Sequence, residues 1–419
     1  MKTGKFQFDR KTSGASVRDG LLFLAYGIYI WFSLLYHTFY QKYIGSGTFK
    51  YVFLLIILIL AVREVLIMKD LHFRQYFRKN WKPLLVCLFG AAMVIKNSMN
   101  SGAVAFSIAY IFIFVYVARN ISFERIARFT ICNTALLLAF VIFSSGIGVI
   151  DDYVAFTENR FRHYLGFKYS LLPPTIVFNL TALLVWLHKE KMPWYITVFL
   201  LALNLGMYDL THSRLTCGTA LLLLMVSCLF TAFPSFPKRD GVIERLMAAS
   251  WPAGFFGSLF VINFFRSTAA PLAKVDSAIG GRLELGNESL RTYGLSLFGK
   301  NISWVGAGLD SHGRRLSETD AAYNYVDNFY VQVCQHYGVV WTLVFLCLLT
   351  YALTRMSRRG DRWTLVIFTI LAFHGIIDDL IMYPHFNTFW LMLGACLIAD
   401  GSECKRFNLD LTEPLPSLL

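Results

Sequence analysis

The sequence predicts an all-α polytopic membrane protein, and three features of its composition support this fold class. Of the 419 residues, 56% are hydrophobic and only 16% are charged, whereas about 25% of residues are charged in an ordinary soluble domain. The mean hydropathy is +0.53, and long apolar runs recur along the chain. These features exclude a soluble globular enzyme, a disordered chain and a disulfide-rich secreted module.

The apolar runs, separated by charged or turn-forming clusters, predict about twelve membrane-spanning helices, since one span needs about 20 mostly apolar residues. The third and the last runs are short for a full crossing, so we expect them to be tilted, re-entrant or supported by neighbouring helices. The twelve runs are 20–40, 51–68, 83–96, 102–118, 127–149, 170–187, 193–209, 215–233, 248–265, 328–354, 363–382 and 386–399.

Basic residues concentrate in alternate connections and predict the orientation of the chain. With a cytoplasmic N-terminus, short inner segments carry 24 basic residues and the outer side carries 14, of which seven lie in one long loop. Short cytoplasmic loops are typically rich in Lys and Arg, so we expect both termini in the cytoplasm. The net charge of +13 then reflects topology, and no nucleic-acid partner is expected. Arg63 and Glu64, near the inner end of the second span, are interpreted as structural.

One long outer connection divides the chain. Apolar residues at helical spacing within it predict an amphipathic helix at 282–298, lying near the outer membrane face. A Gly-rich turn is expected after this helix. The predicted parts are an N-terminal bundle of about nine spans (1–265), a large outer loop or lid (266–326), C-terminal transmembrane helices (327–400) and a cytoplasmic tail (401–419).

The cysteines give no sign of a metal centre or a disulfide framework. Eight are present, but none forms a CxxC pair or a Cys/His group at zinc-ligand spacing. Several lie inside apolar runs, where Cys usually behaves as a small hydrophobic residue. We therefore expect no metal site, no disulfide and no cofactor.

Polar residues gather at the predicted outer ends of several spans. Arginines converging from different spans favour a multiply charged anion, because the guanidinium group matches phosphate bidentately. An anion presented from a bilayer suggests a lipid pyrophosphate, and a nearby carboxylate or His can accept a proton from an attacking hydroxyl. The candidates are Arg160, Arg162 and His163 before the sixth span, Arg214 at the start of the eighth, Arg282 opening the loop helix, Tyr325, Asp327 and Asn328 at the loop's re-entry, and His374.

Each candidate also has a structural interpretation. The arginines at 160–162 can snorkel at the membrane interface. Asp327 together with Asn328 can form a helix N-cap. His374 and Asp378 stand four residues apart on one helical face, where they can brace neighbouring helices.

Four segments and the overall architecture resemble the bacterial Wzy-type polysaccharide polymerases and the related O-antigen ligases. These segments are GGRLELGNESLRTYGLSLFG at 280–299, YNYVDNFYVQVCQHYG at 323–338, RFRHYLG at 160–166 and HSR at 212–214. In the second segment, Asp327 and Asn328 are followed by nine residues and Gly338, which reproduces a spacing of the ligases. The ligases carry His where this chain has Asp327.

The resemblance implies a GT-C-like fold and a metal-independent, inverting glycosyltransferase. Such an enzyme moves a growing glycan from undecaprenyl pyrophosphate to the hydroxyl of an incoming lipid-linked repeat unit, on the outer face of the bacterial cytoplasmic membrane. By this resemblance Arg162, Arg214 and Arg282 clamp the pyrophosphate, and Asp327 activates the acceptor. The supporting residues are Arg160, His163, Tyr325, Asn328 and, as an alternative base, His374.

The implied partners are the undecaprenyl-pyrophosphate-linked oligosaccharide, the lipid bilayer, a chain-length regulator and a flippase. Three alternatives stay open. A ligase differs mainly in its acceptor. A transporter or flippase for the same lipid-linked glycan requires cationic residues along a path through both halves of the membrane. A non-catalytic membrane scaffold requires no convergence of arginines.

Overall fold

The computed structural model describes residues 10–45, 47–71, 73–101, 106–157, 160–236, 241–265, 270–310, 312–315 and 323–398. The predicted tail at 401–419 lies outside these residues. The first half of the described chain contains α1 (Arg10–Tyr36), η1 (Phe39–Tyr43), α2 (Thr48–Leu71), α3 (Phe73–Ser101), α4 (Phe106–Val117), η2 (Ala118–Asn120), α5 (Phe123–Gly146), β1 (Val154–Thr157), β2 (Arg160–His163), α6 (Leu172–His188) and η3 (Lys189–Lys191).

The second half is also helical. It contains α7 (Trp194–Thr211), α8 (Arg214–Ala232), α9 (Val242–Ala248), α10 (Ser250–Asn263), α11 (Ala270–Ala278), α12 (Arg282–Tyr293), α13 (Phe329–Tyr337), α14 (Val339–Arg359), α15 (Arg362–His374), η5 (Leu380–Met382), η6 (Thr388–Leu391) and α16 (Met392–Ile398). Within the described residues, the sheet structure is one two-stranded hairpin, β1–β2. The protein is therefore all-α in class.

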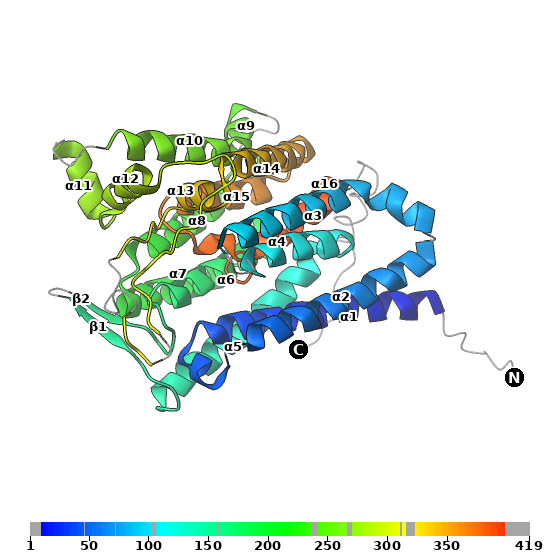
Figure 1. The fold of residues 1–419 in the computed structure, drawn as a ribbon, viewed down its shortest axis with the longest axis horizontal. Helices are drawn as coiled ribbons and strands as arrows, with labels where there is room; N and C mark the ends of the chain where they lie inside the picture. The colour runs from blue at the N-terminus through cyan, green and yellow to red at the C-terminus, as the bar shows by residue number, and fades with distance from the viewer. Residues whose placement is uncertain are drawn as a thin grey trace, which may run out of the picture.

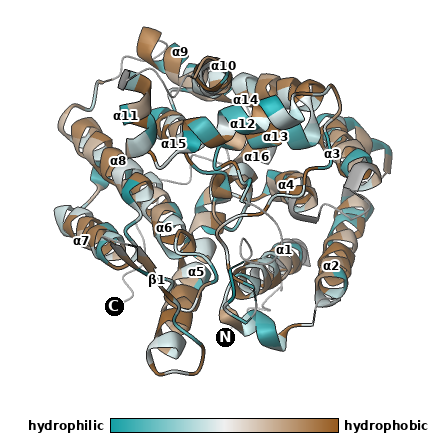
Figure 2. Cartoon of the chain, turned by 60° about the vertical axis from the view of Figure 1, so that its left-hand side comes forward, coloured by the Kyte–Doolittle hydropathy of each residue, from teal (hydrophilic) through white to brown (hydrophobic). Residues whose placement is uncertain are grey.

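Seven of the described helices are long and apolar enough to cross a membrane. They are α1, α2, α3, α5, α7, α8 and α14. The pair α9–α10 passes the same test together but is bent by 62°. Apolar residues also cover outward-facing surfaces of these helices (Figure 2), as expected for helices in contact with lipid. The chain is thus a polytopic α-helical membrane protein, and the number of twelve spans stays a prediction.

Two predicted spans differ from continuous helices. The run 328–354 breaks at Gly338, whose φ of +101° favours glycine. A Cβ there would lie 2.5 Å from the carbonyl oxygen of Leu297, so the outer loop packs directly against the break. In the run 363–382, the helix ends at His374. The Asp378 carboxylate then accepts a hydrogen bond from the Leu380 N–H at 2.9 Å, the kind of local bond by which Asp competes with a continuing helix.

Successive helices run in alternate directions and form a bundle with two different ends (Figure 1). The hairpin β1–β2, the helices α11 and α12 and the yellow segment before α13 gather at the left end in this view. The start of α1 and the α2–α3 corner lie at the opposite end. The predicted inner and outer connections are therefore separated in space.

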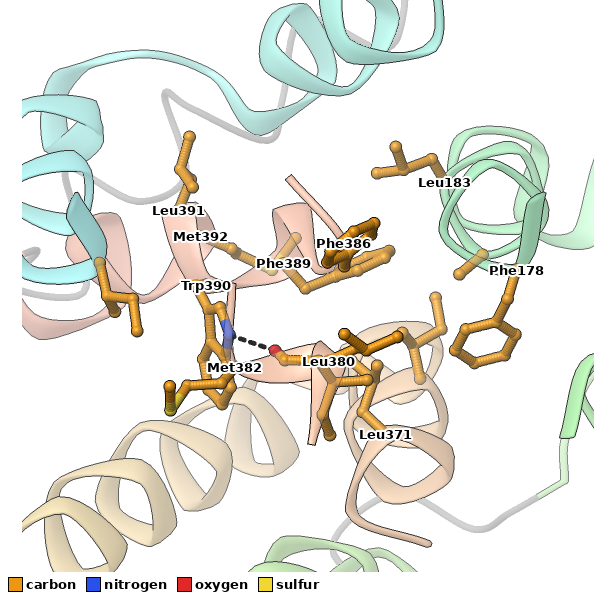
Figure 3. Close-up of a cluster of buried hydrophobic side chains, with 14 of the residues drawn as sticks. Phe178, Leu183, Leu371, Leu380, Met382, Phe386, Phe389, Trp390, Leu391 and Met392 are labelled. Carbon is orange, nitrogen blue, oxygen red and sulfur yellow. Dashed lines mark hydrogen bonds between the residues drawn. The ribbon is translucent and has the colours of Figure 1, made fainter. Parts of the chain in front are cut away.

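The interior of the bundle is built around α6, whose residues from Leu172 to Leu183 are all buried. Phe178 and Leu183 of α6 face a cluster of apolar side chains from the 380–392 segment (Figure 3). The Trp390 indole N–H donates to the carbonyl of Ile381 at 2.8 Å, and this bond links η6 to η5 within the irregular 380–392 segment. The core thus fixes the turn after α15, where Asp378 and Asp379 are located.

Candidate functional site

A cavity of about 330 Å³ lies at the end of the bundle that carries the hairpin and α12. Among the described residues, seven separate segments line it: β2, the stretch before α6, the α7–α8 turn, the α11–α12 turn, the outer loop at Ala307, the stretch before α13 and the end of α15. We call it the arginine cavity. Its charged lining residues are Arg162, Arg214, Arg282, Asp327 and Asp378.

Of the candidates Arg160, Arg162 and His163, the β1–β2 hairpin places Arg162 in the arginine cavity. Arg162 pairs with Ala155 in the strand register, and alternate residues of a strand point to opposite faces. Arg162 and Tyr164 line the cavity, whereas His163 bonds Asp152, with 3.0 Å between Nδ1 and Oδ2. His163 is therefore placed outside the cavity. The side chain of Arg160 lies outside the described part of the chain.

A sharp helix–helix turn places Arg214. His212 has a φ of +51° and ends α7, so the chain reverses direction within two residues and Arg214 begins α8. Residues 213–216 all line the cavity, and the N-terminal turn of a helix carries partial positive charge. The hydroxyl of Ser213 is buried with no hydrogen-bond partner among the described residues. This edge of the cavity therefore combines a guanidinium group, a helix N-terminus and a hydroxyl available to a ligand.

Two glycines and an acidic cap place Arg282 at the start of α12. Gly280 and Gly281 have φ values of +79° and +78°, and the carboxylate of Asp276 accepts from the Leu283 N–H at 2.7 Å. Arg282 Nη1 donates to the carbonyl of Ile279 at 2.6 Å, and Nη2 lies 3.1 Å from Oδ2 of Asp327. Its Nε is buried and has no partner among the described residues. Arg282 thus retains a donor for a ligand.

Asp327 is a half-buried carboxylate beside these arginines, with a side chain that is 15% exposed. Burial raises its pKa to about 6, against the attraction of Arg282, and Asp378 raises it further. The α13 N-cap is Asn328, whose side chain accepts from the Val331 N–H at 3.1 Å. The N-cap interpretation therefore holds for Asn328 and is wrong for Asp327. The Asn328 amide also donates to the carbonyl of Ile376 at 2.8 Å, so this residue joins α13 to the turn after α15.

His374 and Asp378 form the predicted i, i+4 pair, with His374 Nε2 3.5 Å from Asp378 Oδ2. His374 Nδ1 lies 3.0 Å from the hydroxyl of Thr219 in α8, and its ring stacks on Phe178 with 5.0 Å between centroids. Both members of the pair line the arginine cavity. The pair therefore braces α15 against α6 and α8 and also presents polar atoms to the cavity.

Tyr325 is placed away from the arginine cavity. Its hydroxyl donates to Asp379 Oδ2 at 2.6 Å, and both residues line a neighbouring cavity. Tyr169 and Tyr323 line both cavities and were not among the sequence candidates. Only the repeated aromatic residues beside the predicted re-entry, in YNYVDN, gave a signal for Tyr323.

The predicted lid helix is shorter than expected and packs on the bundle. It ends at Tyr293, because Gly294 follows with a φ of +62°. Gly286 lets α12 approach α10, since a Cβ there would lie 3.0 Å from the Ile262 side chain. Ser289 donates to the side-chain carbonyl of Gln335 in α13 at 2.9 Å. These contacts fix the position of Arg282 relative to Asp327.

The arrangement can bind an oxyanion and accept a proton next to it. Among the described residues, three guanidinium groups and two carboxylates line the cavity, so these five side chains together carry one excess positive charge when both acids are ionised. In the part of the chain that the structure describes, no three His, Cys, Asp or Glu residues come together as candidate metal ligands.

The fold and the cavity define a multi-pass helical membrane protein with an arginine-lined site at one end of its bundle. No protein-family model matches the chain, and no curated protein or solved structure matches it significantly. The function is therefore inferred from the geometry of the site.

Proposed function

We propose that this protein is a polysaccharide polymerase that transfers a growing glycan from undecaprenyl pyrophosphate to the hydroxyl of an incoming lipid-linked repeat unit. One observation carries the proposal: Arg162, Arg214 and Arg282 are far apart in sequence but line one cavity together with Asp327. Arginines around an open space suit a diphosphate, because the guanidinium group matches its oxygens bidentately. A carboxylate beside them suits the activation of a hydroxyl.

The reaction exchanges one bond to the anomeric carbon for another. The acceptor hydroxyl oxygen attacks the anomeric carbon, the bond from this carbon to the pyrophosphate oxygen breaks, and the electron pair leaves with the diphosphate. Asp327 receives the proton of the hydroxyl. Arg162 and Arg214 stabilise the charge that develops on the leaving group. Arg282 turns from Asp327 towards the diphosphate and so releases the carboxylate as a base.

The proposed reaction takes place on the outer face of a bacterial cytoplasmic membrane. The cavity lies at the end of the bundle where the long 265–329 connection is found. The short connections rich in Lys and Arg, such as those around α2–α3 and α14–α15, lie at the other end. By the positive-inside rule that other end is cytoplasmic. Twelve spans, cytoplasmic termini and a GT-C-like architecture belong to this proposal.

The test is a polymerisation assay with the full chain reconstituted in lipid nanodiscs. The substrate is the lipid-linked repeat unit extracted from the source strain after deletion of this gene, and the readout is glycan length on a gel. We expect long polymer from the unaltered protein and single lipid-linked units from Arg162→Ala and Arg214→Ala. The matched control is Arg291→Ala, because Arg291 is exposed on the same α12 helix as Arg282.

Polymer of normal length from either cavity variant would contradict the proposal. Transfer of preformed glycan to a different acceptor, with no growth of the repeat, would instead identify a ligase. The orientation is tested separately by labelling single cysteines placed in 294–310 with a membrane-impermeant maleimide in intact cells. Labelling only after lysis would reverse the assigned side.

A further inference from the structure

A second cavity of about 270 Å³ adjoins the arginine cavity. We call it the aromatic cavity, because rings dominate its walls. Trp304 and the stretch 306–309 come from the outer loop. The other segments are the residues just before η1, the start of α6, the stretch before α13 and the turn after α15. Its aromatic lining residues are His37, Tyr169, Trp304, Tyr323, Tyr325 and Tyr383.

The two cavities share one wall. Asp327, Tyr169, Tyr323 and Ala307 line both of them. A group bound in the aromatic cavity therefore has the Asp327 carboxylate between itself and the arginines. This is the position that an acceptor hydroxyl requires when the donor diphosphate occupies the arginine cavity.

The chemistry of the aromatic cavity suits a sugar ring. Aromatic faces offer apolar contact to the C–H groups of a pyranose, and a few placed polar groups fix its orientation. The indole N–H of Trp304 is buried and has no hydrogen-bond partner among the described residues. Asp379 and the Tyr325 hydroxyl, joined at 2.6 Å, offer a further polar edge. Gly306 brings the loop close to the ring of Tyr325, since a Cβ there would lie 3.3 Å from it.

Among the described residues that line this cavity, Lys168 is the cation, and its charge bears on whether the bound sugar is acidic or neutral. Lys168 Nζ donates to the neutral side chain of Gln41 and lies 5.2 Å from the centre of the Tyr36 ring. Among the described residues it forms no ion pair. Burial lowers the pKa of Lys168 to about 8, against the attraction of Asp310, so the ammonium group is still mainly protonated at neutral pH. Lys168 is half-buried, and a partly desolvated cation that forms no direct ion pair gains from a ligand that supplies the opposite charge.

We propose that the aromatic cavity binds the acceptor sugar of the incoming repeat unit and that Lys168 selects a sugar carrying a carboxylate. The assignment of this cavity as an acceptor site rests on the proposed polymerase function. Trp304 and the tyrosines hold the ring, Lys168 binds the sugar carboxylate, and the reacting hydroxyl faces Asp327. The substrate class is therefore an acidic glycan, and its uronic or sialic acid residue is the acceptor.

The experiment measures binding of simple sugars to the full chain in nanodiscs by saturation-transfer NMR. The probes are the methyl glycosides of glucuronic acid, galacturonic acid and N-acetylneuraminic acid, each beside its neutral counterpart, methyl glucoside, methyl galactoside and the methyl ester of N-acetylneuraminic acid. We expect at least one acid to bind more tightly than its neutral counterpart by about tenfold, the effect of one charge-assisted hydrogen bond.

The variants separate this inference from the polymerase proposal. We expect Lys168→Met to remove the preference for the acid and Lys168→Arg to keep it. Trp304→Ala should weaken the binding of both sugars of each pair. Lys42→Met is the matched control, because Lys42 pairs with Asp151 at 3.6 Å outside the cavity. If Trp304→Ala unfolds, Trp304→Phe must retain the preference for the acid with weaker binding.

Equal binding of every acid and its neutral counterpart, or an unchanged preference in Lys168→Met, overturns the inference. Arg214→Ala must leave this sugar binding intact, because Arg214 lines only the arginine cavity. Failure of the polymerase proposal appears elsewhere, as normal polymer from Arg162→Ala or Arg214→Ala. The two failures are thus distinguishable.

Discussion

Two groups of arginines at opposite ends of the bundle differ in what surrounds them. At the α2–α3 end, the fully buried Arg119 bonds Glu64 through Nη2 at 2.6 Å and Asn80 through Nε at 2.9 Å. Arg63 bonds the same Glu64 through Nη1 at 2.7 Å and donates through Nε to a backbone carbonyl. None of these residues lines the arginine or the aromatic cavity.

The arginine cavity shows the opposite condition. Arg282 makes one ion pair and retains a buried Nε without a partner among the described residues. Together with Arg162 and Arg214 it lines an open space of about 330 Å³. Arginine in a membrane protein is thus not itself a sign of a site. The discriminating feature is whether protein acceptors saturate the guanidinium groups or leave donors facing a cavity, because an unpaired buried donor is costly until a ligand binds it.

The largest effect is expected at the saturated cluster. Arg119→Ala leaves Glu64 in a buried position with fewer partners, and breaking a buried ion pair destabilises a protein by about 3–5 kcal/mol. The measurement is the unfolding free energy of the purified protein in detergent. The control is Arg125→Ala, because Arg125 is 53% exposed and pairs with Asp19. An equal loss of stability in Arg119→Ala and Arg125→Ala would contradict the prediction that the buried ion pair contributes more than the exposed one.

A smaller effect of a different kind is expected at the arginine cavity. Arg214→Ala is predicted to lower the transfer rate by about 100- to 1,000-fold, as removal of one donor to a developing oxyanion does. Its unfolding free energy is predicted to stay close to that of the unaltered protein, because Arg214 is exposed and forms no ion pair with another described residue. A drop in stability equal to that of Arg119→Ala would place Arg214 with the structural arginines.

The pH profile tests whether Asp327 is the base. Because its pKa is about 6, the carboxylate is ionised above this pH and protonated below it. We predict that kcat/KM falls about tenfold per pH unit below pH 6 and reaches a plateau above it. Asp327→Asn should be slow at every pH without this slope. If the Asp327→Asn variant keeps this slope in its pH profile, another group is the base, and His374 and Asp378 are the next candidates.

The smallest effect is expected at the surface. Arg314 is 69% exposed and pairs with Asp310 at 3.1 Å, and exposed pairs contribute about 0–1 kcal/mol. Arg314→Ala should therefore change neither the glycan length nor the midpoint of thermal unfolding measurably. A loss of polymer in this variant would show that the outer loop acts through more than the cavity residues.

Sequence reasoning found Arg214 and Asp327 at the boundaries of apolar runs and Arg282 at the start of the predicted loop helix, and the family resemblance singled out Arg162. The resemblance assigned Arg162 to the pyrophosphate clamp and His163 to a supporting role, whereas the register of a short hairpin places Arg162 in the cavity and His163 outside it. Sequence reasoning selected neither Asp379 nor Tyr169 as a site residue. The turn after α15 places Asp379. This turn is held by contacts with α6, which lies far away in the sequence, and by Trp390 of the same segment.

The amino-acid sequence alone determined that this chain is a membrane-embedded helical protein, because hydropathy and charge spacing are local properties that act on each segment independently. The tertiary structure alone decided which arginines are saturated and which face an open cavity. Their partners lie tens to hundreds of residues away, as Glu64 does from Arg119 and Thr219 does from His374. Whether a buried charge is neutralised depends on distances of a few ångströms in space, and only the packing of distant helices sets those distances.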